Sequence, residues 1–148
     1  MDSHEYKSTA RRTAGRNGVA SAESVEQQLT FSAPPEFHGE AGKWTPEHFL
    51  MAAAAACFVT TFVAVAEASK FEMRSLVASA TGALEKVEGG FQFTRVTIRA
   101  TLTITRDADH ERAMKLLQKA ERACIVSRSL RSPVSLEATI EVEVPLAA

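Results

Sequence analysis

The sequence predicts an α+β fold in which antiparallel strands pack against helices on one face. Three observations support this class. A long apolar helix occupies the middle of the chain, segments with a two-residue period lie on both sides of it, and strands and helices do not alternate regularly as in parallel α/β folds. The chain has 148 residues, which suits one domain with a sizeable core. We therefore expect a single domain over residues 1–148.

The N-terminal segment is polar, with short alternating stretches. Asn17-Gly18 is a strong signal for a tight hairpin turn, because a type I′ turn needs positive φ at both central positions. We expect a hairpin or small meander here. The segment that follows, SAPPEFHGEAGKW, has prolines, glycines and no period, so it is predicted to be a loop.

The long helix is predicted to begin at about Thr45 and to end near Ser69 or Lys70. Thr45 suits the N-cap and Pro46 the first helical position. Glu47 lies in the first turn, where the helix dipole favours an acid.

Apolar residues occupy every face of this helix, so it should be covered all round. One domain of this length could hardly wrap it alone, and we expect a homodimer in which it is a long buried central helix. The stretch from Phe49 to Ala66 has no charge and meets the lower length limit for a membrane span. Its flanks lack an aromatic belt or a basic cluster, so a buried core helix is favoured and no membrane partner is expected.

A period of two residues begins after this helix and predicts two strands joined by a hairpin turn at 88–90. The residues expected on one face of the first strand are Leu76, Ala78, Ala80, Gly82 and Leu84. Those expected on one face of the second strand are Phe91, Phe93, Val96, Ile98, Ala100, Leu102 and Ile104.

A second helix is predicted from Asp107 to Cys124, capped by Asp107 or Asp109, with an amphipathic spacing. Pro133 should interrupt whatever follows Cys124. The last predicted strand has one apolar side formed by Val134, Leu136, Ala138, Ile140, Val142 and Val144.

Composition and motifs exclude several classes of function. The formal net charge is −1, so no excess of positive charge favours nucleic acid. The N-terminus lacks the apolar segment of a secretory signal, and a cytoplasmic location is expected. The histidines lack the spacing of a zinc site, and GRNG is not a phosphate-binding loop. We expect no metal and no cofactor.

The chain has two cysteines, which in a reducing compartment are either inert core residues or active thiols. Burial of Cys57 in an apolar helix would raise its pKa and quench its reactivity, so a positive charge would have to approach it. Cys124 ends the second helix. The two thiols could act as a peroxidatic and resolving pair, or they could be unrelated core residues.

Three stretches, GRNG, TPEHFLMAAAAACF and AERACIVS, resemble the OsmC/Ohr family of thiol-dependent organic hydroperoxide reductases. The resemblance covers about residues 6–144 in the same order. The family pattern N-P-E-Q-L-x-A-A-x-x-A-A-C-F is matched at Pro46, Glu47, Ala52, Ala55, Ala56, Cys57 and Phe58. Thr45 stands where Asn is usual, His48 where Gln is usual, and Ile125 where a proline commonly follows the second cysteine.

The resemblance implies an intertwined homodimer with active sites at the subunit interface. Cys57 would be the peroxidatic thiol and Cys124 the resolving one. Arg16 would hold the thiolate, and Glu47 would position this arginine. The enzyme would reduce organic hydroperoxides to alcohols through a thiolate, sulfenic acid and disulfide cycle, with a dithiol reductant of the lipoyl type.

Two alternatives remain open from the residues. One is a non-catalytic dimeric module that binds a small apolar ligand, and the other is a thiol enzyme of the same fold with another substrate. Geometry adds a separate expectation: Glu47 and Cys57 would be about 15 Å apart along a straight helix, with about 80° of rotation between them. If both residues serve one site, either the helix is broken between them or Glu47 comes from the partner chain, and we favour the partner as a hypothesis.

Overall fold

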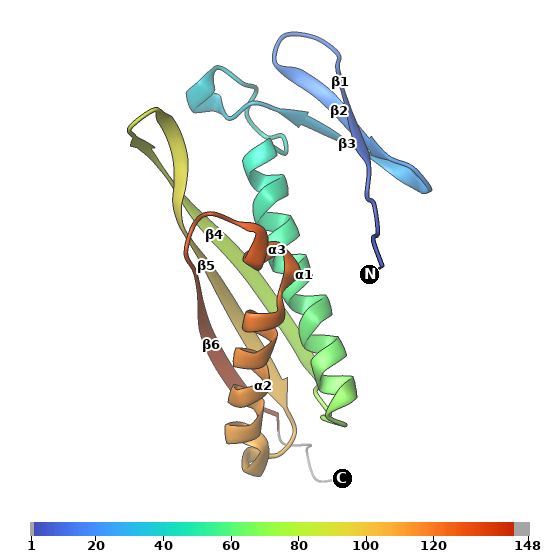
Figure 1. The fold of residues 1–148 in the computed structure, drawn as a ribbon, viewed down its shortest axis with the longest axis vertical. Helices are drawn as coiled ribbons and strands as arrows, with labels where there is room; N and C mark the ends of the chain where they lie inside the picture. Colours follow the sequence, from blue (N-terminus) through green and yellow to red (C-terminus); the bar gives the residue numbers. More distant parts are fainter. Residues whose placement is uncertain (1, 144–148) are drawn as a thin grey trace. The chain divides into compact units, whose positions relative to one another are not determined.

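The computed structural model describes residues 2–143, and these fall into two compact units that divide between Leu50 and Met51. Helix α1, Pro46–Ala68, crosses from one unit into the other. The first unit also holds a three-stranded sheet (Figure 1), formed by β1 (Ser8–Arg12), β2 (Asn17–Ala22) and β3 (Val25–Ser32). The second unit holds β4 (Ser75–Val87), β5 (Gly90–Ile104), α2 (His110–Ala123), α3 (Ile125–Ser129) and β6 (Val134–Val142).

The sheet of the first unit is an antiparallel meander in the order β1-β2-β3. This confirms the expected N-terminal meander, but the position predicted for its first turn is wrong. The chain turns over residues 13–16, where Gly15 has a φ of 55° and Asn17 N–H donates to Ala14 O at 2.9 Å. Asn17 and Gly18 are already the first residues of β2.

Gly18 is needed for space rather than for a turn. A Cβ placed on it would lie 2.4 Å from Phe31 Cζ and 2.8 Å from Arg11 O, and neither contact is sterically allowed without movement of a neighbour. The absence of a side chain lets the Phe31 ring cross over the middle strand. A glycine in the sequence can mark either a residue with positive φ or a place where another group approaches the backbone closely, and the sequence alone does not distinguish the two.

The predicted loop after β3 is confirmed, with a short 3₁₀ helix at Pro35–Phe37. Two hydrogen bonds of Ser32, at the start of the loop, hold its later residues in place. Ser32 N–H donates to Trp44 O at 2.8 Å, and Ser32 Oγ accepts from Glu40 N–H at 2.8 Å. Ser32 is fully buried, so these bonds satisfy polar atoms that water does not reach.

Helix α1 begins as predicted, with Thr45 Oγ1 accepting a hydrogen bond from His48 N–H at 3.1 Å. Within the second unit only one of its sides is covered. Buried residues recur every fourth position at Ala54, Phe58, Phe62 and Ala66. Burial of each phenylalanine stabilises the fold by about 1.5–3 kcal/mol.

The opposite side of α1 is exposed and carries small residues, namely Ala52, Ala56, Thr60 and Ala64. One copy of the chain therefore does not provide the all-round cover expected from the sequence. Within residues 2–143, α1 is the one helix that is long and apolar enough to cross a membrane, and 22% of its apolar stretch is buried.

The sheet of the second unit has the strand order β4-β5-β6. The predicted alternation in β4 is confirmed: residues 76–84 alternate between half-buried and exposed side chains as far as Gly82. In β5 the apolar residues change from odd to even positions between Phe93 and Val96. The pairing with β4 shifts between Ala83 and Leu84 and leaves Thr94 as a bulge. The turn at residues 88–90 is also confirmed.

The expectation that all strands are antiparallel is wrong for β6, which pairs with β5 in parallel from Val96↔Val134 to Ile104↔Val142. The connection between these strands contains α2 and α3, and a helical crossover returns the chain to the same end of the sheet. Strand β6 alternates as predicted up to Val142. Val144, the last residue of the predicted apolar side, lies outside the described residues.

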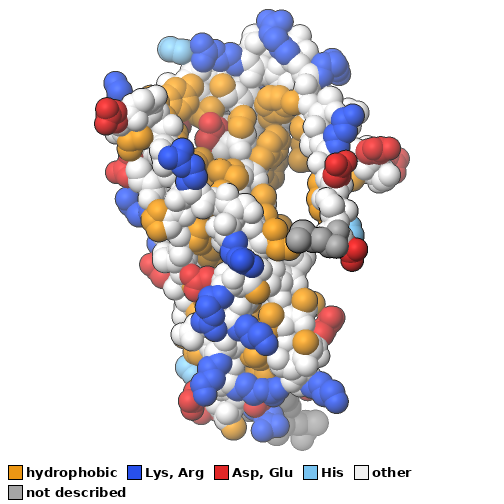
Figure 2. Space-filling view, in the orientation of Figure 1, with side chains coloured by type: hydrophobic (Ala, Val, Ile, Leu, Met, Phe, Trp, Pro, Cys, Tyr) orange, Lys and Arg blue, Asp and Glu red, His pale blue; other side chains and the backbone are white. Residues whose placement is uncertain are grey.

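Helix α2 packs its apolar stripe, Ala113, Leu116, Leu117 and Ala120, into the core of the second unit. Lys and Arg side chains gather over its solvent face (Figure 2). Asp109 occupies the predicted N-cap position, but its side chain makes no capping hydrogen bond and instead pairs with Arg106 at 3.6 Å. Cys124 is the C-cap residue, and the short helix α3, which the sequence did not predict, follows it directly.

Candidate active site at a cysteine pair

The two cysteines meet in the second unit. Cys57 lies in the middle of α1, and Cys124 lies at the junction of α2 and α3. A hydrogen bond joins the two side chains, and both are free thiols. Cys124 is fully buried, whereas Cys57 is half-buried. The site therefore pairs a thiol with access to solvent with one that is shielded from it.

Three further groups contact the Cys57 sulfur. The backbone N–H groups of Ile125 and Val126 donate hydrogen bonds to it, and Thr61 Oγ1 lies 3.8 Å from Sγ. Thr61 follows Cys57 by one helical turn, so their side chains share one face of α1.

The start of α3 explains why two N–H groups are available. The first N–H groups of a helix have no carbonyl partner inside it. Cys124 is in an extended conformation, with φ −63° and ψ 113°, and its carbonyl accepts from Arg128 N–H at 3.0 Å. This bond fixes the turn. The N–H groups of Ile125 and Val126 have no carbonyl partner within α3, so they can donate to the Cys57 sulfur.

Opposing effects set the pKa of Cys57. Burial raises this pKa, because a thiolate loses hydration. The N–H of Val126, the thiol of Cys124, the hydroxyl of Thr61 and the N–H of Ile125 stabilise the charged form, and together they hold the pKa of Cys57 below its ordinary value. Within the second unit, neutral hydrogen-bond donors lower the pKa of Cys57, whereas the sequence led us to expect that a cation would do so.

Arg16 and Glu47 belong to the first unit. Arg16 Nη1 donates to Phe37 O at 2.6 Å, and the residue is exposed. Glu47 is half-buried, and within residues 2–143 its Oε2 atom is buried with no hydrogen-bond partner. The contacts of this range include no ion pair between Arg16 and Glu47.

Helix α1 is continuous from Pro46 to Ala68. Of the two ways in which Glu47 and Cys57 could serve one site, the broken helix is therefore excluded. A Glu47 supplied by a partner chain stays a prediction.

Sequence reasoning missed three of the groups around Cys57, namely Thr61 and the N–H groups of Ile125 and Val126. The spacing of Thr61 from Cys57 was a usable signal, since residues four apart share a helix face. The N–H groups gave no signal, because every residue except proline has one.

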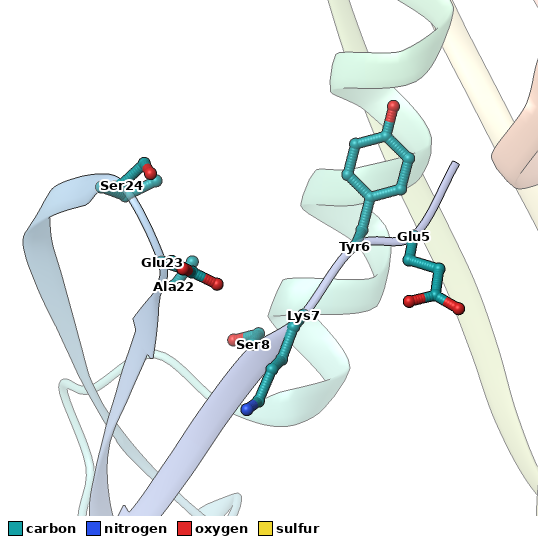
Figure 3. A pocket seen from close by; sticks show the side chains of 8 residues that line it. Glu5, Tyr6, Lys7, Ser8, Ala22, Glu23 and Ser24 are labelled. Carbon is teal, nitrogen blue, oxygen red and sulfur yellow. The ribbon is translucent and has the colours of Figure 1, made fainter. Parts of the chain in front are cut away.

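A hollow of about 700 Å³ lies in the first unit, between the segment before β1 and the β2–β3 turn (Figure 3). It is lined by Glu5, Tyr6, Lys7, Ser8, Ala22, Glu23, Ser24 and Val25, and it contains no cysteine. In the described part of the chain, no three His, Cys, Asp or Glu residues lie together as metal ligands would.

Known proteins resemble this chain over most of its length. The model of the OsmC-like protein family matches residues 38–139. The chain is 29% identical over 146 residues to the uncharacterized protein YmaD of Bacillus subtilis, covering 97% of each chain. It is 28% identical to peroxiredoxin OsmC of Escherichia coli, covering 83% of this chain and 85% of the relative.

The fold is shared with a solved structure. A crystal structure of an organic hydroperoxide resistance protein OsmC from Legionella pneumophila is 26% identical and superposes with a TM-score of 0.75. The match covers 96% of this chain and 100% of the other.

Proposed function

We propose that this chain, which belongs to the OsmC-like protein family, is a thiol peroxidase that reduces organic hydroperoxides to alcohols. One observation carries the proposal: Cys57 has a lowered pKa and shares a hydrogen bond with a second thiol, Cys124. An inert core cysteine needs neither feature. The names of the relatives, a peroxiredoxin and an organic hydroperoxide resistance protein, agree with it.

The reaction follows from this pair of thiols. The Cys57 thiolate attacks the terminal oxygen of the hydroperoxide, the O–O bond breaks, and the alkoxide takes a proton and leaves as the alcohol. Cys57 is now a sulfenic acid, oxidised by two electrons. The Cys124 sulfur attacks the Cys57 sulfur, a disulfide forms, and the hydroxyl group leaves as water with the thiol proton. An external dithiol of the lipoyl type then returns two electrons and two protons.

The groups around Cys57 have complementary parts in this cycle. The N–H groups of Ile125 and Val126 stabilise the thiolate before attack, and the buried Cys124 thiol waits within contact of the sulfur that it must resolve. Because Cys124 is also the residue that precedes α3, the resolving thiol and the two N–H donors belong to one turn of the chain.

Arg16 and Glu47 complete the proposed site. A guanidinium is permanently charged and can hold a thiolate while it donates to a peroxide oxygen. The buried Glu47 oxygen, which has no hydrogen-bond partner among residues 2–143, supports this role, because a buried carboxylate oxygen needs a donor. Arg16 would be the cation that Glu47 positions, and the continuity of α1 favours a Glu47 from the partner chain.

The proposed enzyme is a homodimer of single OsmC/Ohr-like domains, each formed by residues 1–148, in the cytoplasm. The exposed side of α1 supports the dimer. Its small residues, Ala52, Ala56 and Ala64, leave room for another element to approach closely, and an apolar helix of this length is rarely left uncovered in water. A second copy would turn α1 into the buried central helix that the sequence predicts.

The test is a steady-state peroxidase assay with cumene hydroperoxide and hydrogen peroxide, each with dihydrolipoamide or dithiothreitol as the reductant. We expect turnover with the organic hydroperoxide that is lost in Cys57→Ser. A tenfold preference for hydrogen peroxide would contradict the organic substrate. Turnover of neither peroxide would favour a thiol enzyme with another substrate, or a binding module if the Cys57 thiol also reacts like an ordinary cysteine.

A further inference from the structure

Thr45 and His48 bind each other reciprocally at the start of α1. His48 N–H donates to Thr45 Oγ1 at 3.1 Å, and Thr45 N–H donates to His48 Nδ1 at 3.2 Å. The Thr45 hydroxyl is also 2.9 Å from Nδ1. This is a capping box, in which the third residue after the cap reaches back to the N–H of the cap; Glu or Gln usually fills that position. Here an imidazole fills it.

The Thr45 N–H can donate to Nδ1 only while Nδ1 keeps its lone pair, as in a neutral ring with its proton on Nε2. The Thr45 hydroxyl can either donate to Nδ1 or accept from it. A second proton would go to Nδ1. The Thr45 N–H would then face another donor, and since Thr45 is only 3% exposed, water could hardly replace the lost acceptor.

The charges around the ring act in both directions. Lys43 lines the same hollow as His48, with Gly42 and Trp44, and both this lysine and the positive end of the helix dipole oppose a charged imidazole. Lys43 is itself paired with Glu40 at 3.2 Å. Glu47, the adjacent residue on the helix, would favour the charged form. The Trp44 ring meets the imidazole edge at 6.1 Å and carries no charge.

We propose that His48 is a proton-sensitive positioning residue: while neutral it closes the Thr45 cap and holds the first turn of α1, and with it Glu47, in the arrangement that the peroxidase site uses. This inference rests on the proposed function. Glu47 lies between the two members of the box, so loosening of the box moves the backbone that carries its carboxylate. Uptake of a proton by His48 loosens the turn and lowers the turnover.

The decisive variant is His48→Gln. Glutamine closes a capping box but takes up no proton in the mildly acidic range. At pH 8 we expect the wild-type protein and H48Q to turn over cumene hydroperoxide within twofold of each other. At pH 5.5 the wild type should be slower than H48Q by roughly fivefold, the effect of one lost hydrogen bond. Protonation of Cys57 slows both proteins alike and cancels in their ratio.

His48→Ala is the matched control, because it removes the box at every pH. Its rate relative to H48Q should be low and nearly constant between pH 5.5 and 8. A ratio of wild type to H48Q that does not change with pH, while both proteins are active, would overturn the inference and leave the peroxidase intact.

A second measurement does not depend on activity. In ¹H–¹⁵N spectra recorded from pH 8 to pH 5.5, the Thr45 amide signal should move in the wild type and stay in place in H48Q. If neither protein turns over peroxide at pH 8, the proposed function fails, and the amide titration decides alone whether the box opens. A Thr45 signal that stays in place in the wild type would overturn the proton-sensitive box.

Discussion

Cys57 and Cys124 share a hydrogen bond between their side chains although they come from α1 and from the junction of α2 and α3. The contact exists while both thiols are free. Both helices contribute to the same core in the second unit, so their packing places one sulfur beside the other. Disulfide formation therefore requires only local movement of these side chains and of the short turn that carries Cys124.

The first prediction concerns this step. One equivalent of cumene hydroperoxide should convert the reduced protein to a Cys57–Cys124 disulfide, seen as a loss of two hydrogens by mass spectrometry without reductant. Cys124→Ser should stop at the sulfenic acid of Cys57, which dimedone traps. Cys57→Ser is the control and should form neither product. A wild-type protein that accumulates only the sulfenic acid would contradict the resolving role of Cys124.

The pH dependence of Cys57 alkylation is the second prediction. Burial raises the pKa of Cys57, but the hydrogen bonds to its sulfur lower this pKa by more than burial raises it, so the net shift is downward. The rate of reaction with iodoacetamide should reach half its maximum at a lower pH than for glutathione. Cys124 is fully buried, so the fast phase reports on Cys57. A midpoint at or above that of glutathione would contradict the lowered pKa.

The same shift has a consequence for stability. A group with a lower pKa in the folded state stabilises that state above its unfolded pKa, and this contribution is lost as the pH falls through the folded pKa. The thiolate of Cys57 should therefore stabilise the folded protein fully at pH values above the pKa of this thiol in the unfolded chain. This contribution should be gone at pH values below the pKa of the thiol in the folded protein.

Ile125→Pro gives the third prediction, because it removes one N–H donor and little else. Proline is tolerated at the first position of a helix, and the ψ of 113° at Cys124 suits the residue before a proline. The pKa of Cys57 should rise, and its alkylation near pH 7 should slow by a few fold, while the donor from Val126 remains. Ile125→Ala keeps the N–H and loses only a side chain that is 74% exposed, so it should behave like the wild type.

Much of the fold was accessible from the sequence because its signals are local. Thr45 and Pro46 mark the start of α1 through capping chemistry, and the period of two in β4 and β6 follows from burial of one face of a sheet. The parallel pairing of β6 was not accessible in this way, since direction depends on the crossover through α2 and α3. Gly18 shows the same limit, because its role depends on where Phe31 lies in space.

The candidate site likewise has features that the sequence shows and features that only the structure shows. The two cysteines could be selected from the sequence as a pair, because thiols are rare and their chemistry is distinctive. The lowered pKa of Cys57 could not be explained from the sequence, since Ile125 and Val126 contribute backbone N–H groups and not their side chains. The burial of a Glu47 oxygen without a hydrogen-bond partner in the described part of the chain is likewise visible only in three dimensions.

Arg16→Ala is the fourth prediction. If Arg16 holds the thiolate and the peroxide, its loss should lower kcat/KM for cumene hydroperoxide by about two to three orders of magnitude, as for removal of a key electrostatic group from an active site. Arg12→Ala is a matched control, since Arg12 is exposed and its side chain donates to the Gly15 carbonyl at 2.9 Å. The circular dichroism spectra of both variants should be unchanged. Unchanged turnover in R16A would refute its assignment.

The last prediction tests why β2 begins with a glycine. Gly18→Ala places a methyl group 2.4 Å from Phe31 Cζ and 2.8 Å from Arg11 O. The ring of Phe31 can rotate away, but the carbonyl belongs to the neighbouring strand, where Arg11 pairs with Val19, and it cannot move without disturbing the sheet. We expect a loss of about 1–3 kcal/mol in the free energy of unfolding, as for other overpacked sites. Combining G18A with Phe31→Leu, which removes the ring, should recover only the part of this loss that the ring causes. Full recovery in the double variant, measured by urea denaturation, would show that the backbone contact does not matter.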